Sequence, residues 1–139
     1  MAMESENSAV DQVLLSKLKA RVDGLYLEYV FPVLATLRLG EDPAAVAAEA
    51  ELLAAARAAG VIVRRYIMPE DLSLEDVDRL IRQINADPQL SALLVWRPLP
   101  AHLDAETVYG LITPTKALRE GPVCEVLTRV IDAAERSAQ

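Results

Sequence analysis

The sequence predicts an α/β domain of three layers, in which a short parallel sheet of about three to four strands is flanked by helices. Short aliphatic runs alternate along the chain with segments of helical periodicity, a pattern typical of parallel sheets with right-handed crossovers. Glycine and proline separate these segments. Apolar residues make up 53% of the 139 residues and aromatic residues only 4%, so we expect an aliphatic core.

The first expected elements are a helix and a strand. Residues 1–8 are polar and predict a disordered terminus, whereas residues 9–139 are expected to form a single domain. Apolar side chains then recur at helical spacing, at Val10, Leu14, Leu18, Val22 and Leu25. Residues 31–39 form an aliphatic run that predicts a buried strand, ended by Gly40.

Turn and cap residues delimit the elements that follow. Asp42 and Pro43 suit the cap and first turn of a helix, which Gly60 would end. Residues 61–68 predict the second strand. Ser73 is a candidate N-cap for the next helix.

The last third of the chain continues the alternation. Residues 92–96 predict a third strand, and Pro98-Leu99-Pro100 a rigid turn after it. A short helix is expected from Asp104 and a final helix from about Pro122. Ligands of such sheets bind beyond the carboxyl ends of the strands, here near Gly40 and the proline-rich turn.

Charge and composition limit the partners. A net charge of −7 repels phosphate backbones and anionic membranes, so we expect neither nucleic acid nor a membrane as partner. The single cysteine, Cys124, excludes an internal disulfide and fits a cytoplasmic protein. No metal-ligand spacing is present, so we expect no metal site.

Two motifs suggest a family. G-E-D-P-A occupies residues 40–44, and N-A-D-P at residues 85–88 leads into L-V-W-R-P-L-P at residues 94–100. In order and spacing they resemble the N-terminal catalytic domain of the methylenetetrahydrofolate dehydrogenase/cyclohydrolase family, over roughly residues 14–116. The resemblance implies a folate-binding cleft. The chain has no G-x-G-x-x-G, so we expect no nucleotide-binding domain and no NADP site.

The resemblance also assigns functional positions. The family's tyrosine that stacks on the pterin corresponds to Ala48, and its catalytic lysine to Leu52. Its glutamine and leucine before the P-L-P turn correspond to Trp96 and Arg97, and its pterin-binding aspartate to Arg119. These replacements imply that the dehydrogenase and cyclohydrolase reactions have been lost.

Our leading hypothesis from the sequence is therefore a diverged relative that binds a folate-like small molecule or serves as an accessory protein. The expected ligand-binding residues are Asp42, Ala48, Leu52, Trp96, Arg97, Pro98, Leu99 and Pro100. Trp96 either contacts the ligand or plugs the vacated cleft, and the sequence leaves both possibilities open.

Two alternatives remain open at this point. The first is an enzyme of specialised metabolism whose cleft, shaped by Trp96 and Arg97, acts on a non-folate substrate with Asp42, Glu49 or His102 as acid or base. The second is a structural partner subunit with a closed cleft.

Each of these candidate groups also has a simpler interpretation. Glu49 and Glu51 are expected mainly as surface charges, His102 as a structural residue and Cys124 as a buried small hydrophobe. The apolar faces of the two terminal helices, at residues 14–25 and 123–134, predict a homodimer or hetero-oligomer interface.

Overall fold

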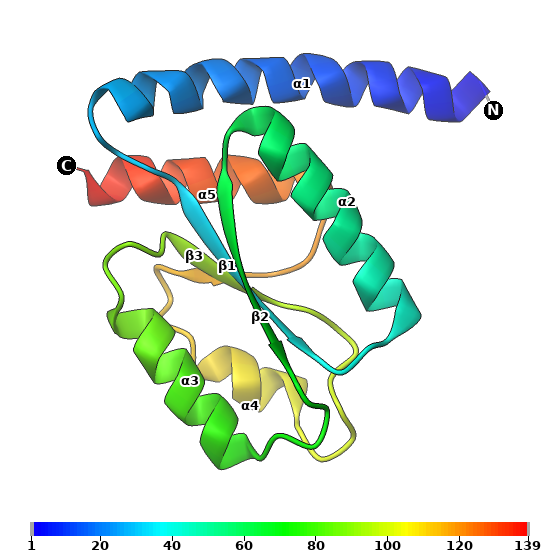
Figure 1. Cartoon of the computed structure of the whole chain (residues 1–139), viewed down its shortest axis with the longest axis vertical. Helices are drawn as coiled ribbons and strands as arrows, with labels where there is room; N and C mark the ends of the chain where they lie inside the picture. Colours follow the sequence, from blue (N-terminus) through cyan, green and yellow to red (C-terminus); the bar gives the residue numbers. More distant parts are fainter. Residues whose placement is uncertain (1, 139) are drawn as a thin grey trace.

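The computed structural model describes the backbone of residues 2–138 and the side chains of residues 12–138. Helices and strands alternate along this part of the chain (Figure 1). The helices are α1 (Ala2–Leu27), α2 (Pro43–Ala59), α3 (Leu74–Ala86), α4 (Ala105–Gly110) and α5 (Val123–Ser137). The strands are β1 (Val33–Leu39), β2 (Ile62–Met68), β3 (Ala92–Val95) and β4 (Ala117–Leu118).

The sheet has four strands in the order β2-β1-β3-β4, and every pairing is parallel. β1 lies in the interior of the sheet and all seven of its residues are buried, which explains its nearly unbroken aliphatic sequence. β4 has only two residues, paired with Leu93 and Leu94 of β3, and no periodicity predicted it. The expected α/β fold with a short parallel sheet is confirmed.

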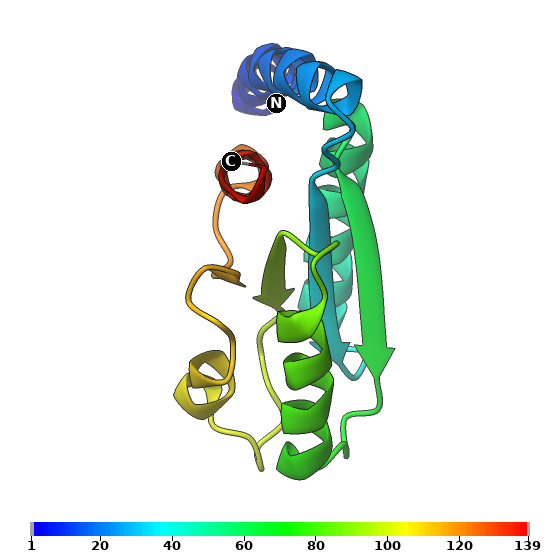
Figure 2. The same ribbon diagram turned by 90° about the vertical axis from the view of Figure 1, so that its left-hand side faces the viewer.

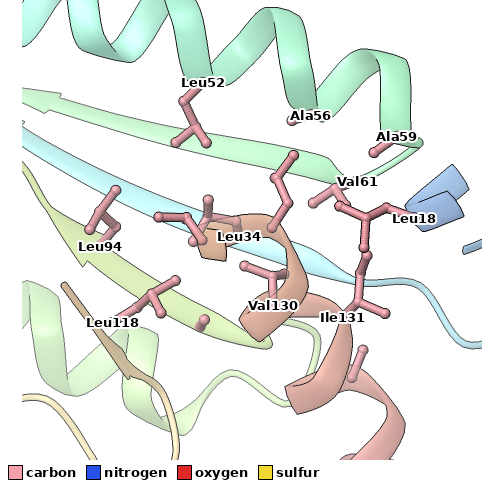
Figure 3. Packing of buried hydrophobic residues seen from close by; sticks show 14 of the residues in the cluster. Leu18, Leu34, Leu52, Ala56, Ala59, Val61, Leu94, Leu118, Val130 and Ile131 are labelled. Carbon is pink, nitrogen blue, oxygen red and sulfur yellow. The ribbon is translucent and has the colours of Figure 1, made fainter. Parts of the chain in front are cut away.

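Helices cover both faces of the sheet and produce three layers (Figure 2). On one face, side chains from α1, α2 and α5 pack against the sheet in a single apolar cluster (Figure 3). Its members include Leu18, Val22, Leu34, Leu52, Leu94, Leu127 and Ile131. On the other face, α3 and α4 bury a second cluster that includes Leu37, Val77, Ile81, Leu93 and Val108.

The predicted caps form as expected. The Asp42 side chain accepts a hydrogen bond from the backbone N–H of Ala45 at 3.1 Å, and Ser73 caps α3 in the same way. Gly60 ends α2 with φ +81°, a conformation that favours glycine. A Cβ at Gly60 would also lie 3.2 Å from Cγ1 of Val22, so its absence lets α1 approach the end of α2.

One expectation about the terminal helices needs correction, and a second stays a prediction. α1 already begins at Ala2, so the backbone of residues 2–8 is helical where we expected disorder, while the domain boundaries otherwise stay a prediction. Much of the apolar faces expected to form an oligomer interface packs within the chain, although Leu14 is 41% exposed. Leu18 and Val22 of α1 and Leu127 and Ile131 of α5 belong to one core cluster.

The contact between α1 and α5 also has a polar edge. The Arg21 guanidinium donates to Asp132 at 2.8 Å and to Glu135, both on α5. The two helices lie side by side in Figure 1.

Within residues 2–138, no helix has both the length and the apolar character needed to cross a membrane. The oligomeric state and the cytoplasmic location stay predictions.

Candidate catalytic cavity at the carboxyl ends of the strands

A cavity of about 400 Å³ opens between α2, the end of β3 and the start of α5. α2 and β3 contribute the apolar side chains of Ala48, Leu52 and Leu94 to the lining, and Trp96 follows directly after β3. The remaining lining residues are Glu51, Glu120, Gly121, Pro122, Val123 and Val126. The cavity therefore lies where parallel sheets usually bind ligands.

Local geometry fixes the α2 wall. Gly40, with φ +91°, turns the chain after β1, and its N–H donates to the carbonyl of Met68 at 2.9 Å. Asp42 and Pro43 then begin α2 directly at the edge of the sheet. Ala48 and Leu52 are four residues apart and so lie on one face of that helix, toward the sheet.

Trp96 extends the line of β3 beyond its last residue. Its N–H donates to the carbonyl of Leu37 at 2.9 Å, so its backbone is held against β1. The side chain is only 5% exposed. A cavity remains beside the indole, so the ring fills only part of the cleft.

Glu120 closes the cavity on the side of β4. Its Oε1 accepts the backbone N–H of Arg97 at 2.5 Å, which ties the segment before α5 to the segment after β3. Burial raises the pKa of the nearby Tyr109 hydroxyl, and the Glu120 carboxylate raises it further. The Tyr109 hydroxyl donates to the carbonyl of Val95 at 2.9 Å.

Arg119 does not line this cavity. Its guanidinium carbon lies 4.4 Å from the centre of the Tyr109 ring, and its nitrogens approach Glu106 at 3.3 and 3.4 Å. The residue next to it, Glu120, contributes an acid to the cavity. The basic replacement expected at Arg119 therefore lies outside the cavity lining, and the acid there is Glu120.

The expected ligand-binding residues are only partly brought together. Ala48, Leu52 and Trp96 line the cavity. Arg97 lies at its edge through its bond to Glu120, but the cavity lining does not include it. Asp42 acts as the cap of α2, and Pro98, Leu99 and Pro100 also lie outside the lining.

The three groups proposed as acid or base for a repurposed enzyme do not converge. Asp42 caps α2, and the exposed ring of His102 is bonded through Nε2 to the carbonyl of Leu72 at 2.8 Å. Glu49 is buried, at 3% exposure, and is paired with Arg38 and Arg65. The expectation that Glu49 is a surface charge is wrong, because α2 turns it against the sheet.

Glu51 and Glu120 are the titratable side chains in the cavity wall. From the sequence Glu51 is expected mainly as a surface charge, and no sequence pattern indicates a role for Glu120. The break at Gly121-Pro122 marks the start of α5, but nothing in the sequence shows that this start lies beside α2.

The three lysines of the chain do not line the cavity, and Lys116 donates to three carbonyls, those of Ile84, Asn85 and Asp87.

Two further hollows have different positions. One of about 650 Å³ runs between α1 and α5, shares Glu51, Pro122 and Val123 with the candidate cavity, and is also lined by the half-buried Cys124. Another of about 480 Å³ lies at the amino ends of the strands, near Ile62.

Among residues 12–138, no group of three or more His, Cys, Asp and Glu side chains could hold a metal ion.

Comparison with known proteins identifies the family. Residues 6–118 match the model of the tetrahydrofolate dehydrogenase/cyclohydrolase catalytic domain. The bifunctional protein FolD of Lactobacillus delbrueckii subsp. bulgaricus is 38% identical over 100 residues, which are 72% of this chain and 35% of that protein. Its counterpart in Geotalea uraniireducens is 32% identical over 116 residues, 84% of this chain and 41% of that protein.

Solved structures agree with the fold. The bifunctional methylenetetrahydrofolate dehydrogenase/cyclohydrolase of Campylobacter jejuni superimposes with a TM-score of 0.76 at 23% identity, over 78% of this chain and 38% of that enzyme. The Trypanosoma brucei enzyme, solved with NADP and an inhibitor, gives 0.74 at 24% identity, over 78% of this chain and 37% of that enzyme.

These relatives correct the hypothesis that the chain has lost the family's reactions and only binds or assists. They are named as bifunctional enzymes, and nothing in the comparisons shows a loss of activity. The hypothesis followed from the replacements at Ala48, Leu52, Trp96, Arg97 and Arg119, whereas the structure places the acids Glu51 and Glu120 in the cavity. The chain spans 35–41% of the length of these two relatives. It belongs to the tetrahydrofolate dehydrogenase/cyclohydrolase family, in the catalytic domain.

Proposed function

We propose that this chain binds a one-carbon derivative of tetrahydrofolate in the cavity between α2 and α5 and catalyses the cyclohydrolase type of reaction there. The observation that carries the proposal is the cavity itself, which combines an apolar wall with two carboxylates at the carboxyl ends of the strands. Half of its lining residues lie within residues 6–118, which match the family's catalytic domain, and the other half follow that range at residues 120–126.

The apolar wall suits the planar ring of the substrate. Ala48 and Leu52 from α2 face Leu94 and Trp96 across the cavity, and together they present aliphatic and aromatic surface. Carboxylates are hydrogen-bond acceptors only, so Glu51 and Glu120 suit the amino and ring N–H groups of a pterin. This arrangement supports binding by apolar contact, with orientation set by the acids.

The carboxylates also supply the acid–base step. Hydrolysis of a methenyl bridge begins when a water oxygen bonds to the bridge carbon and loses a proton. In the proposal, Glu51 or Glu120 accepts that proton. The hydroxyl on the carbon then loses its proton to form the carbonyl while the bond between the carbon and one nitrogen breaks and that nitrogen receives a proton. The bridge becomes a formyl group on the other nitrogen, and one proton is released overall.

The residues described do not fit a dinucleotide cofactor. A pyrophosphate usually binds at an uncapped helix N-terminus after a glycine-rich turn. Here the Asp42 carboxylate already occupies the start of α2, and acids also stand in the first turns of α3, α4 and α5. We therefore derive no hydride-transfer step for this chain, and the absence of an NADP site stays a prediction.

The test is a spectrophotometric assay of 5,10-methenyltetrahydrofolate hydrolysis by the purified chain. We expect hydrolysis above the uncatalysed rate, and a loss of about 100-fold in Glu51→Gln or Glu120→Gln, because a positioned acid or base contributes about that factor. Glu75→Gln, on the opposite face of the sheet at the start of α3, serves as the matched control and should leave the rate unchanged.

Two results would contradict the proposal. If the purified chain hydrolyses the substrate only at the uncatalysed rate, the proposed reaction is wrong. If Glu51→Gln, Glu120→Gln and Glu75→Gln all hydrolyse it at equal rates, the assignment of the acids is wrong. Titration calorimetry with the same substrate measures the binding affinity separately from the rate of hydrolysis. It distinguishes a substrate that binds weakly from one that binds well and is hydrolysed slowly.

A further inference from the structure

Lys116 ties the chain that precedes α5 to the end of α3. Its ammonium donates to the carbonyl oxygens of Ile84 at 3.0 Å, Asn85 at 3.0 Å and Asp87 at 2.6 Å. These carbonyls lie at the C-terminal end of α3, where the last carbonyls of a helix lack partners within the helix. The negative end of a helix also attracts a cation. The half-buried ammonium therefore lies where its charge and its three donors are satisfied.

The side chain of Asn85 fastens the start of the same stretch of chain. Its Nδ2 donates to the carbonyl of Leu111 at 2.9 Å, and its Oδ1 accepts the N–H of Thr113 at 3.0 Å. The N-A-D-P motif at residues 85–88 thus contacts residues 111–116 through one side chain and two carbonyls. The motif itself lies outside the cavity lining.

Few contacts other than those of Lys116 fix the short strand β4. It pairs with β3 over two residues, and Leu118 is the buried side chain that anchors it. The next residue, Arg119, is held by an exposed ion pair with Glu106 and by the ring of Tyr109. Exposed ion pairs contribute little to stability, so the bonds of Lys116 are the main side-chain polar anchor of this stretch.

Glu120 lies four residues after Lys116 and enters the cavity wall. Its side chain is exposed, so packing does not fix it. Its carboxylate accepts the N–H of Arg97 at 2.5 Å, and a charge-assisted bond of this kind requires that the chain before α5 lie close to the chain after β3. A reacting acid must also be placed accurately, because small displacements lower a rate strongly.

We propose that Lys116 is a positioning residue: by fixing β4 against the end of α3, it holds the Glu120 carboxylate in the cavity and on the N–H of Arg97. This inference rests on the proposed function, in which Glu120 orients the ligand or takes the proton. Lys116 lies outside the cavity lining, so it acts through Glu120. Asn85 fixes the start of the same segment, which gives the N-A-D-P motif a part in the site.

The backbone amide signal of Arg97 reports the position of Glu120. In a nitrogen-15 spectrum of the purified chain, a short bond to a carboxylate moves this amide proton downfield. We expect Lys116→Met to move it upfield, toward its position in Glu120→Ala, which has no carboxylate. Lys19→Met removes a lysine charge from an exposed ion pair on α1 and, as the matched control, should leave the signal in place. An Arg97 signal that stays unmoved in folded Lys116→Met would overturn the inference.

A double variant shows whether Lys116 acts through Glu120. We expect Lys116→Met to slow hydrolysis of 5,10-methenyltetrahydrofolate about 10-fold, because a misplaced acid reacts less often. In the Glu120→Gln background the same change should cost less than about 2-fold, since no acid is left there to misplace. Lys116→Arg keeps a cation with several donors and should recover most of the rate. Losses that multiply in the two backgrounds would contradict the inference, because a general loss of structure lowers the rate in both.

The outcomes separate the two proposals. If the parent chain hydrolyses the substrate only at the uncatalysed rate, the proposed function is wrong, while the Arg97 signal still tests the inference about Lys116. If the parent chain is active and the Arg97 signal does not respond to Lys116→Met, the inference is wrong and the proposed function stands. Should Lys116→Met fail to fold, Lys116→Gln, which keeps one donor group, is measured in the same way. A smaller upfield shift is then expected, and no shift overturns the inference.

Discussion

Glu49, which forms an ion pair with Arg38, is the clearest case of a single residue whose role depends on its surroundings. Arg38 is 6% exposed in β1, and Glu49 is 3% exposed in α2. Their side chains approach at 3.4 and 3.5 Å, and Arg38 also donates to the carbonyl of Gly40 at 2.6 Å. Arg65 adds a third charge, at 3.2 Å from Glu49. This network links the turn after β1 to α2.

Removing one member of the pair should be costly. We expect Glu49→Ala to lower the free energy of unfolding by about 3 kcal/mol, because the buried Arg38 then keeps only the exposed Glu41, at 3.6 Å, as a counter-charge. Urea denaturation measures the change. Glu51→Ala, two residues along the same helix and exposed, is the matched control and should change stability by less than about 0.5 kcal/mol.

A double variant separates charge burial from packing. Arg38→Leu with Glu49→Leu removes both charges together and should recover most of the lost stability, since an apolar pair of similar volume is often neutral or better. A double variant that is no more stable than Glu49→Ala would contradict the interpretation as a paired buried charge.

At the scale of elements, the short helix α4 depends on its cap. It has six residues, too few to be stable by itself, so the groups at its ends contribute a large share of its stability. The Asp104 carboxylate accepts the backbone N–H of Thr107 at 3.0 Å and its hydroxyl at 2.9 Å. These bonds, the backbone bond first, lower the pKa of Asp104 below its ordinary value.

The cap predicts a pH dependence. Because the folded-state pKa of Asp104 lies below the unfolded value, its contribution is fully present above about pH 4 and is lost as the pH falls through the folded-state pKa. We expect Asp104→Ala to melt lower than the parent chain at pH 7 and the two melting temperatures to converge near pH 2. Thermal melts by circular dichroism measure this, and a difference that is constant with pH would contradict it.

At the scale of the whole molecule, the layer formed by α1, α2 and α5 is the larger part of the core. Val22 is fully buried in it, against α2 and near Gly60. The same apolar faces would form an oligomer interface if α1 and α5 were apart. Because they pack together within one chain, we expect the stability of this layer not to depend on a second copy.

Experiment can distinguish packing of these helices within one chain from an interface between two copies. We expect Val22→Ala to lower the free energy of unfolding by about 2 kcal/mol through the cavity that it leaves. The denaturation midpoints of both proteins should be independent of protein concentration over a 100-fold range. A midpoint that rises with concentration would show instead that an interface between copies contributes to the stability.

The sequence by itself determined the local structure of this protein. The turn at Gly40, the caps Asp42 and Ser73 and the stop at Gly60 depend on backbone geometry and on hydrogen bonds within a few residues, so their positions could be predicted. The alternation of aliphatic runs with helical segments likewise predicted the parallel sheet and its three layers.

The tertiary structure alone decided which side chains share the cavity. Glu49 and Glu51 are two residues apart in an alanine-rich helix with little periodicity, and only the packing of α2 on the sheet makes one buried and leaves the other in the cavity wall. Glu120 reaches the cavity because β4 pairs with β3 and α5 returns beside α2. Such contacts join residues far apart in the chain, and no local pattern records which face of a helix they will cover.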